Sequence, residues 1–297
     1  MILVTGASGY LGSALWSALE RQGLVCISAG RTGADRFFDL NDACPSEDLL
    51  AGVSTVVHCA GLAHNRGAEA EYQRLNVEGA LGLAKAAIRA KVVRFIHISS
   101  LNVVPASAEG PNLPAAALPA PSESYARSKW LAERELTALF SEAGSELIIV
   151  RPALIYDRQL HGNLAKLHNS LPIRLPDTGK RSMVSRPDLI EVLTQLLQRP
   201  QAVASTVDHC AVADGQAYSA HRISEALVPG RALELPRFFW SGLFSLLGLL
   251  PLQLTRALLQ SLTEEHWTSP DGNAVPQAVR WRLEDLQDEV NQGGQTP

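Results

Sequence analysis

Tyr125 and Lys129 stand four residues apart in the stretch SYARSKW, in a chain with only five tyrosines and five lysines among 297 residues. A helix predicted over 123–143 would place both side chains on one face. A phenol with an ordinary pKa near 10 is a poor base at neutral pH. An ammonium about 4 Å away in a partly buried site would lower that pKa by as much as ~3 units. The pair could then exchange a proton with a hydroxyl or a ketone, although the spacing also fits a surface Tyr and Lys.

Three glycines, Gly6, Gly9 and Gly12, follow the apolar run ILVTG at the start of the chain. In such a loop one glycine makes the turn, a second admits a pyrophosphate, and a third lets helix and strand pack closely. The N-terminus of the following helix then faces the phosphates. This strand–turn–helix context predicts a dinucleotide site, with further contacts from Ser8, Tyr10 and Leu11. A glycine-rich turn in an unrelated α/β fold is the alternative.

The second predicted strand ends in the residues AGRT, positions 29–32. NAD-selective sites usually carry Asp or Glu there to hold the ribose hydroxyls. Because Arg31 lies there instead and no acid does, the sequence favours NADP, while NAD stays possible if Arg31 stacks on the adenine. Asp39, which precedes Leu40, could reach the adenine amine from the next loop or cap the turn that follows.

Apolar strand-like runs alternate with helical periodicity over the first half of the chain. This pattern predicts a Rossmann-type doubly wound parallel sheet with helices on both faces. A loop as long as 104–121 is expected to be functional or mobile. We predict a dinucleotide-binding domain from 1–155 plus about 187–213, and a smaller, discontinuous substrate lobe from 156–181 and 214–297. The predicted strands are 2–6, 24–29, 54–61, 92–100 and 146–152, and the predicted helices are 10–22, 68–90 and 123–143.

Composition excludes several classes of protein. The net charge of −4 argues against a nucleic-acid binder, which usually shows a basic excess. The four cysteines lack the spacing of a zinc site or a disulfide framework, so we expect no metal and a reducing, cytoplasmic setting. The apolar segment 238–250 is shorter than the ~20 residues that cross a bilayer, and a buried or partner-facing helix is favoured over membrane contact.

Six stretches taken in order resemble the extended short-chain dehydrogenase/reductase family, in its nucleotide-sugar epimerase/dehydratase branch. They are TGASGYLG, VVHCAGLAH, LNVEGALGLAKAA, FIHISSLNVV, SYARSKWLAE and VRPALIYD. The resemblance runs from residue 2 to about 190 and is weak beyond 213. It also implies a homodimer, in which helices 68–90 and 123–143 pair with those of a second copy.

The resemblance assigns roles to individual residues. Tyr125 resembles the catalytic acid/base, Lys129 its activator and ribose ligand, and Ser100 the residue that hydrogen-bonds the reacting oxygen. A hydroxyl at the carboxyl end of the fourth predicted strand is well placed for this, because α/β proteins bind ligands at that edge. The resemblance also implies further contacts around the cofactor. Ser99 would support Ser100 from the position before it, and Asn76 would shape the fourth predicted strand. Ala60 and Gly61 would pass the cofactor's phosphates, and Pro152 would lie beside the nicotinamide.

The reaction is narrowed by the residues that follow Ser100. Dehydratases of this family carry Asp-Glu there, whereas this chain has Leu101 and Asn102, which cannot shuttle protons. With dehydration excluded, the reaction that the resemblance still implies is hydride transfer at a sugar carbon. The stretches SSLNV and GNLAKL…KRSMVS most resemble bacterial enzymes that reduce UDP-4-keto-6-deoxy-N-acetylhexosamines at C4 for surface polysaccharides. A UDP-hexose or N-acetylhexosamine 4-epimerase and a non-catalytic NADP-binding redox sensor are the alternatives.

The stretch 162–188 resembles the nucleotide-binding segment of UDP-sugar enzymes. In that segment Asn163 would contact the nucleotide, and Arg181 would hold the diphosphate through charge-assisted hydrogen bonds. The alternative for Arg181 is an ion pair with Asp177 in a loop.

Overall fold

The computed structural model describes residues 1–42, 44–63, 67–168, 173–200, 205–227, 233–236, 239–240 and 282–285. The apolar segment 238–250 lies almost wholly outside these residues. In the part of the chain that is described, no helix combines the length and the apolar composition needed to span a bilayer.

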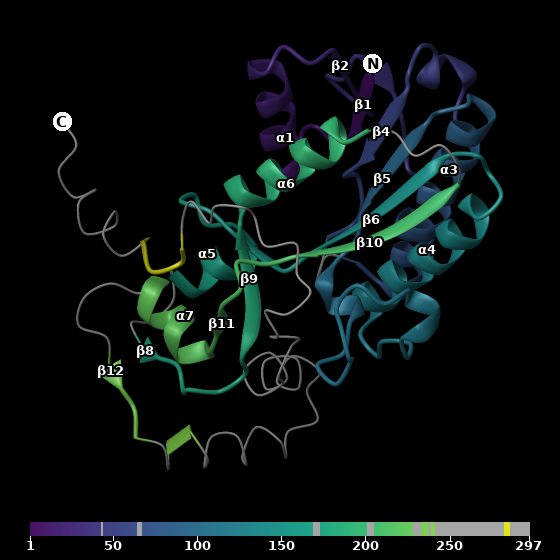
Figure 1. The fold of residues 1–297 in the computed structure, drawn as a ribbon. Coiled ribbons are helices and arrows are strands. Elements are labelled where there is room, and N and C mark those ends of the chain that lie inside the picture. Colours follow the sequence, from purple (N-terminus) through teal and green to yellow (C-terminus); the bar gives the residue numbers. More distant parts are fainter. Residues whose placement is uncertain are drawn as a thin grey trace, which may run out of the picture.

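A seven-stranded sheet forms the centre of the larger part of the molecule (Figure 1). In spatial order its strands are β10 (Thr206–Val212), β6 (Glu146–Pro152), β5 (Arg94–Ile98), β4 (Thr55–His58), β1 (Ile2–Thr5), β2 (Cys26–Gly30) and β3 (Arg36–Phe37). Every neighbouring pair is parallel, so all carboxyl ends meet at one edge. The winding direction reverses between β1 and β4, which confirms the predicted doubly wound fold. The two-residue strand β3 was not predicted, because it is too short to show a period.

Helices cover both faces of the sheet, because successive strand residues point to opposite sides. On β5, Ile96 packs in the core under α1 and α6, whereas Phe95 packs in the core under α3 and α4. Both side chains are fully buried, which explains the continuous apolar runs of the strand sequences. The helices of this part are α1 (Tyr10–Arg21), α2 (Glu69–Tyr72), α3 (Gly79–Arg89), α4 (Ser124–Phe140) and α6 (Arg186–Gln198), with short 3₁₀ turns at Glu47–Leu50, Leu101–Val103 and Ala115–Ala117.

The helix predicted over 68–90 is not uniformly α-helical. A π-helical segment, Gln73–Glu78, separates α2 from α3. Such segments insert an extra residue per turn and often occur at functional sites. Asn76 lies in this segment and is buried.

The loop 104–121 is fastened to the body of the protein. The indole Nε1 of Trp130 donates to the Ala115 carbonyl at 2.8 Å, and the Ala211 amide donates to Asn112 Oδ1 at 2.7 Å. The second bond also satisfies a main-chain donor on the edge strand β10. The loop was expected to be either functional or mobile, and these contacts favour an ordered, functional loop over a mobile one.

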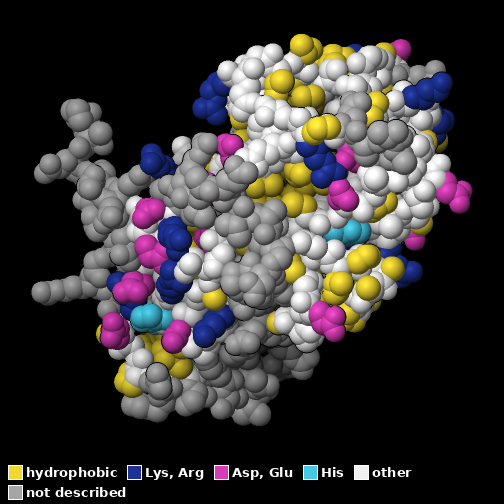
Figure 2. Space-filling view, in the orientation of Figure 1, with side chains coloured by type: hydrophobic (Ala, Val, Ile, Leu, Met, Phe, Trp, Pro, Cys, Tyr) yellow, Lys and Arg dark blue, Asp and Glu magenta, His cyan; other side chains and the backbone are white. Residues whose placement is uncertain are grey.

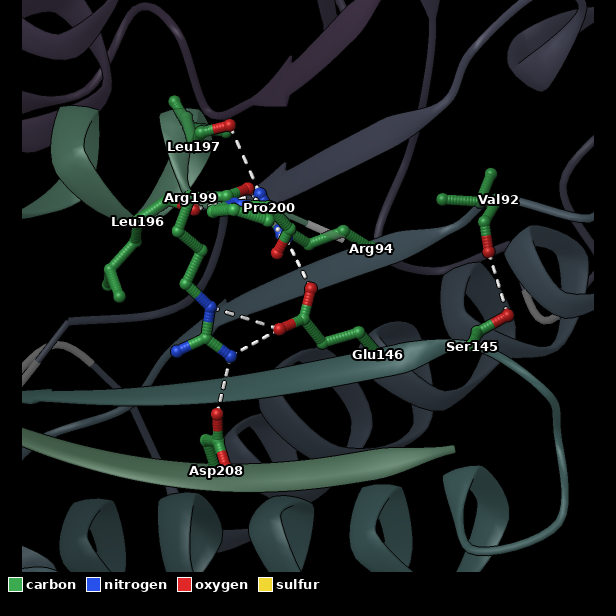
Figure 3. Close-up of polar contacts among 9 residues, drawn as sticks. All are labelled: Val92, Arg94, Ser145, Glu146, Leu196, Leu197, Arg199, Pro200 and Asp208. Atoms are coloured by element: carbon green, nitrogen blue, oxygen red, sulfur yellow. Dashed lines mark hydrogen bonds and ion pairs between the residues drawn. The ribbon is translucent and has the colours of Figure 1, made fainter. Parts of the chain in front are cut away.

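A cluster of charged side chains, buried at its centre, joins three strands and a helix at the amino edge of the sheet (Figure 3). Arg94 Nε lies 2.5 Å from Glu146 Oε2, and both side chains are at most 2% exposed. The other Arg94 nitrogens donate to main-chain carbonyls at and after the end of α6, including that of Leu196 at 2.9 Å. Arg199 pairs with both Glu146 and Asp208. The cluster therefore fixes where α6 ends relative to the strands.

A smaller group of elements lies beside one end of the sheet (Figure 1) and has a separate apolar core. In that core Tyr156 and Tyr218 both donate to Asp214 Oδ2, at 3.1 and 2.6 Å. Leu283, near the C-terminus, is fully buried in the same core. Acidic and basic side chains alternate over this group (Figure 2), and one pair, Arg222–Glu284, fastens residues 282–285 to it. Its elements are β7 (Leu154–Tyr156), α5 (Gly162–His168), β8 (Ile173–Arg174), β9 (Arg181–Ser185), β11 (Ala217–Tyr218), α7 (Ala220–Leu227) and β12 (Leu233–Glu234).

Candidate functional site

The glycine loop lies at the point where the winding of the sheet reverses. Gly6 has φ +68°, and a Cβ there would lie 2.8 Å from the Ala60 nitrogen in the loop after β4. A Cβ on Gly12 would lie 2.1 Å from the Gly6 carbonyl oxygen. The Gly9 amide closes the turn on the same oxygen at 2.9 Å. Only glycine allows this loop to pack so closely against both β4 and α1, and the cradle fits a dinucleotide pyrophosphate.

We expect Gly12→Ala to weaken dinucleotide binding by about 5–150-fold. The added methyl would overlap the Gly6 carbonyl and force the loop away from α1, at a cost of about 1–3 kcal/mol. The measurement is titration of NADPH fluorescence, combined with a thermal melt. Gly110→Ala is the matched control, since a Cβ there meets nothing within 4 Å. Equal affinities of the two variants would contradict this account of the loop.

Ala60 is positioned by a buried chain of hydrogen bonds. Its amide donates to Thr5 Oγ1 at 3.2 Å, and Thr5 Oγ1 lies 2.8 Å from His58 Nδ1. The Thr5 hydroxyl therefore links the Ala60 amide to the buried ring of His58. Burial, with a smaller contribution from Lys129, lowers the His58 pKa to about 3, so the ring stays neutral.

The loop after β2 presents Arg31 to solvent, and its own acid, Asp35, is hydrogen-bonded back to Ser28. Asp35 Oδ2 accepts from both the amide and the hydroxyl of Ser28 at 2.8 Å, which closes the loop at its base. These hydrogen bonds, led by the Ser28 amide, hold the Asp35 pKa below its usual value. Residues 29–34 contain no Asp or Glu that could bind the ribose hydroxyls at the end of β2.

Asp39 caps the turn that follows it, which was one of its two predicted roles. Its Oδ1 accepts from the Asn41 amide at 3.0 Å and from the Asn41 side chain at 2.9 Å. The pKa of Asp39 is lowered, first by the Asn41 amide and further by the charges of Arg31 and Arg74. Arg74, in the π-helical segment, was not predicted, since its distance in sequence from Arg31 gave no signal.

Leu40 is held against α3 at a glycine. A Cβ on Gly79 would lie 2.5 Å from the Leu40 carbonyl oxygen. The loop that carries Asp39 and Leu40 therefore approaches the first turn of α3 as closely as main chain allows.

Asn76 shapes a different strand end from the one predicted. Its Nδ2 donates to the Leu62 carbonyl at 3.1 Å, and its Oδ1 accepts from the Leu62 amide at 2.7 Å. Nδ2 also lies 3.1 Å from Ser128 Oγ on α4. Asn76 thus fastens the loop after β4, next to Gly61, rather than the fourth predicted strand. This correction follows from its place in the π-helical segment, which faces that loop.

Tyr125 is partly buried near the start of α4 and is hydrogen-bonded to the Ser100 side chain. The prediction that its pKa would fall is wrong for this structure. Burial raises the pKa of Tyr125 to about 12, the Ser100 hydrogen bond opposes this, and Glu123 and Tyr72 add to it. The Tyr72 ring meets the Tyr125 ring edge-on, with centroids 5.9 Å apart. At neutral pH this phenol is protonated and is therefore an acid.

Lys129 is buried one turn further along α4, and its ammonium donates a hydrogen bond to the main chain. Nζ donates to the Ile98 carbonyl at 2.9 Å. A Cβ on Gly61 would lie 3.5 Å from Nζ, so the loop after β4 passes directly beside it. Burial lowers the pKa of Lys129 to about 8, although Glu133 and Cys59 oppose this. For both Tyr125 and Lys129, burial changes the pKa more than the attraction between phenolate and ammonium that the sequence spacing suggested.

Ser100 and Ser99 follow β5 at the carboxyl edge and point in opposite directions. The Ser100 hydroxyl contacts Tyr125 and also accepts from the Asn102 amide at 3.2 Å. The Ser99 hydroxyl instead donates to Glu133 Oε1 at 2.5 Å in the interior. Ser100, Tyr125 and Lys129 are therefore brought together at the end of β5. The glycine loop follows β1, and β4 lies between these two strands.

The Tyr10 side chain faces the smaller group of elements. Arg186 lies over its ring at 4.5 Å, and the His161 ring lies 4.3 Å from it. Arg186 also donates to the Tyr10 carbonyl at 3.1 Å and pairs with Asp157. Burial, ahead of the Asp157 charge, raises the Tyr10 pKa to about 12. This cluster joins the glycine loop to the chain after β7, a contact that sequence spacing could not reveal.

The other predicted residues occupy several environments. Pro152 is buried as the last residue of β6, and Leu11 packs against the core, whereas Ser8 is exposed. Asn163 lies on α5 in the smaller group. Arg181 begins β9, and burial lowers its pKa.

These features define a dinucleotide-dependent α/β enzyme with a Ser-Tyr-Lys site at the carboxyl edge of its sheet. Residues 2–208 match the model of the NAD dependent epimerase/dehydratase family. The chain belongs to this family, which confirms the resemblance to the extended short-chain dehydrogenases/reductases.

Two relatives match over about two thirds of each protein. A UDP-glucose 4-epimerase of Vibrio cholerae is 32% identical over 228 residues, which is 68% of this chain and 67% of that protein. A dTDP-4-dehydrorhamnose reductase of Mycobacterium tuberculosis is 29% identical over 211 residues, 66% of this chain and 65% of that protein.

Solved structures share the fold. MoeE5 in complex with UDP-glucose and NAD superimposes with a TM-score of 0.70 over 99% of both chains, at 22% identity. UDP-glucose 4-epimerase from Thermotoga maritima, with UDP-glucose, gives 0.68 over 99% of both chains, at 16% identity.

Proposed function

We propose that this chain reduces the C4 ketone of a UDP-4-keto-6-deoxy-N-acetylhexosamine with NADPH, in the synthesis of a surface polysaccharide. The observation that carries the proposal is the Ser100–Tyr125 hydrogen bond beside buried Lys129, with Leu101 and Asn102 where a dehydratase needs acids. A phenol that is protonated at neutral pH has a proton to give to the carbonyl oxygen and cannot accept one.

Each residue of the site has a defined task in this reaction. A dinucleotide held along the glycine loop would supply the hydride for the carbonyl carbon. The Tyr125 phenol gives its proton to the carbonyl oxygen, and the Ser100 hydroxyl donates a hydrogen bond to the same oxygen. The Lys129 ammonium stabilises the phenolate that remains, and solvent returns the proton. We assign Arg181 and Asn163 to the nucleotide of the substrate, where a guanidinium would pair with the diphosphate.

A second candidate is 4-epimerisation of a UDP-hexose or its N-acetyl derivative. It is supported by the Vibrio relative, whose name states that activity. Ser100, Tyr125 and Lys129 would then remove the proton of the C4 hydroxyl and later restore it. Between these two steps the ketosugar would rotate, so that the hydride returns to its other face. Tight cofactor that stays bound through purification would favour this reaction over net reduction.

The assay that separates these functions mixes purified protein with NADPH and the UDP-linked ketosugar and follows NADPH absorbance. Stoichiometric loss of NADPH supports the reductase. No loss, together with interconversion of UDP-hexoses in the presence of NAD, would establish the epimerase. Cofactor binding without either reaction would support a redox sensor. Light scattering tests the proposed homodimer through α2–α3 and α4, and a monomer at micromolar protein would contradict it.

We expect Arg31→Ala to raise the Kd for NADPH by about 10–100-fold and to leave the Kd for NADH within about twofold. A charge-assisted hydrogen bond to the 2′-phosphate is worth about 1.5–3 kcal/mol, and only NADPH carries that group. Arg89→Ala, which removes an exposed positive charge from the end of α3, is the control. Parallel losses for both cofactors would show that Arg31 contacts a group that they share.

We expect the rate of reduction to fall with rising pH above about 8. The folded pKa of Lys129 is lowered to about 8, so its ammonium is present below that pH and is lost above it. Without this charge the Tyr125 phenolate is less stable and proton donation slows. The measurement is kcat/KM from pH 6 to about 9.5, the upper end lying roughly 1.5 units above this pKa. The decrease should be absent in Lys129→Met, and its persistence there would assign it to another group.

A further inference from the structure

A buried ion pair lies directly behind the Ser-Tyr-Lys site. Glu133 on α4 and Arg151 on β6 have no exposed side-chain surface, and Arg151 Nη2 lies 2.6 Å from Glu133 Oε2. Arg151 Nη1 donates to the carbonyls of Pro111 and Leu113 at 2.7 and 2.8 Å. The pair therefore joins a helix, a strand and the loop 104–121. Because both charges are satisfied, its geometry is well defined.

Three residues on one face of α4 hold three consecutive residues at the end of β5. Tyr125, Lys129 and Glu133 are spaced at four-residue intervals, which places them on a single helix face. Tyr125 contacts the Ser100 hydroxyl, Lys129 bonds the Ile98 carbonyl at 2.9 Å, and Glu133 accepts from the Ser99 hydroxyl at 2.5 Å. The first two contacts belong to the proposed chemistry, whereas the third does not.

We propose that Ser99, held by the Glu133–Arg151 pair, is a positioning residue that aims the Ser100 hydroxyl at the reacting oxygen. The backbone at Ser100 is extended, with φ −155° and ψ 145°, so the two side chains point to opposite sides. The Ser99 amide also donates to the Val150 carbonyl at 2.7 Å, which fixes the main chain. With the main chain and the Ser99 side chain both held, the Ser100 side chain extends from a fixed backbone and reaches Tyr125.

The test is a double-mutant cycle in the reductase assay, and it rests on the proposed function. Ser99→Ala leaves the Glu133–Arg151 pair intact, so the variant is expected to fold. If Ser99 acts through Ser100, kcat falls by about 10–100-fold with KM within about twofold, since small misplacements have effects of this size. In a Ser100→Ala background the same change should have no further effect. An equal loss in both backgrounds would overturn the proposal.

A matched serine and a structural readout complete the experiment. Ser145 is also buried, and its hydroxyl donates to the Val92 carbonyl at 2.7 Å at the opposite edge of the sheet (Figure 3). Ser145→Ala should leave kcat unchanged. A crystal structure of Ser99→Ala needs no substrate, so it decides the matter even if the wild type proves inactive on the ketosugar and the proposed function fails. More than one Ser100 rotamer supports the proposal, and a single unchanged rotamer refutes it.

Discussion

Replacing Tyr125 by Phe is expected to lower kcat by about 10²–10⁴-fold while cofactor affinity stays within about threefold, because the phenol is the only proton donor that we place at the carbonyl oxygen. Burial holds its pKa near 12, so the hydroxyl is protonated throughout the working range of pH. The lost hydroxyl contributes to the transition state and little to ground-state binding, so KM should change less than kcat. Steady-state kinetics and NADPH titration measure the two quantities separately.

The control for Tyr125→Phe is the same substitution at Tyr72. This ring packs edge-on against Tyr125, and its hydroxyl donates to the Ala63 carbonyl at 3.0 Å. The Tyr72 ring and its contact with Tyr125 are kept in this variant, and we place no proton transfer on its hydroxyl, so kcat should change by less than about tenfold. If Tyr72→Phe were as damaging as Tyr125→Phe, the assignment of the proton donor would have to be withdrawn.

Much of the fold could be predicted because the strands and helices follow from sequence patterns within each segment. The order of strands and helices follows from apolar runs and helical periodicity, and Gly6 and Gly12 are required by close packing of the loop that they form. Ser100, Tyr125 and Lys129 could be grouped because parallel strands bring their carboxyl ends together. The coarse location of the site therefore follows from topology.

The parts that could not be predicted depend on contacts between distant residues. Burial, which spacing does not report, reversed the expected pKa shift of Tyr125. Asn76 faces the loop after β4 because of a π-helical segment that has no sequence period. The contact of Tyr10 with Arg186 joins residues 176 positions apart. In each case the chemistry of a recognisable residue is set by partners that only the folded chain selects.

Glu146→Gln is expected to reduce the free energy of unfolding by about 3–5 kcal/mol, because it leaves two arginines without the carboxylate between them. Figure 3 shows Glu146 between Arg94 and Arg199, with Arg94 only 2% exposed, so its charge cannot be compensated by water. Guanidinium-induced unfolding followed by circular dichroism measures the loss. Asp208→Asn is the control: among the described residues this carboxylate pairs only with Arg199, and it is 46% exposed, so its removal should have an effect of about 0–1 kcal/mol. The cluster lies at the amino edge of the strands, away from Tyr125, so kcat of the folded Glu146 variant should match the wild type. Similar stabilities for the two variants would mean that the buried pair contributes no more than a surface contact.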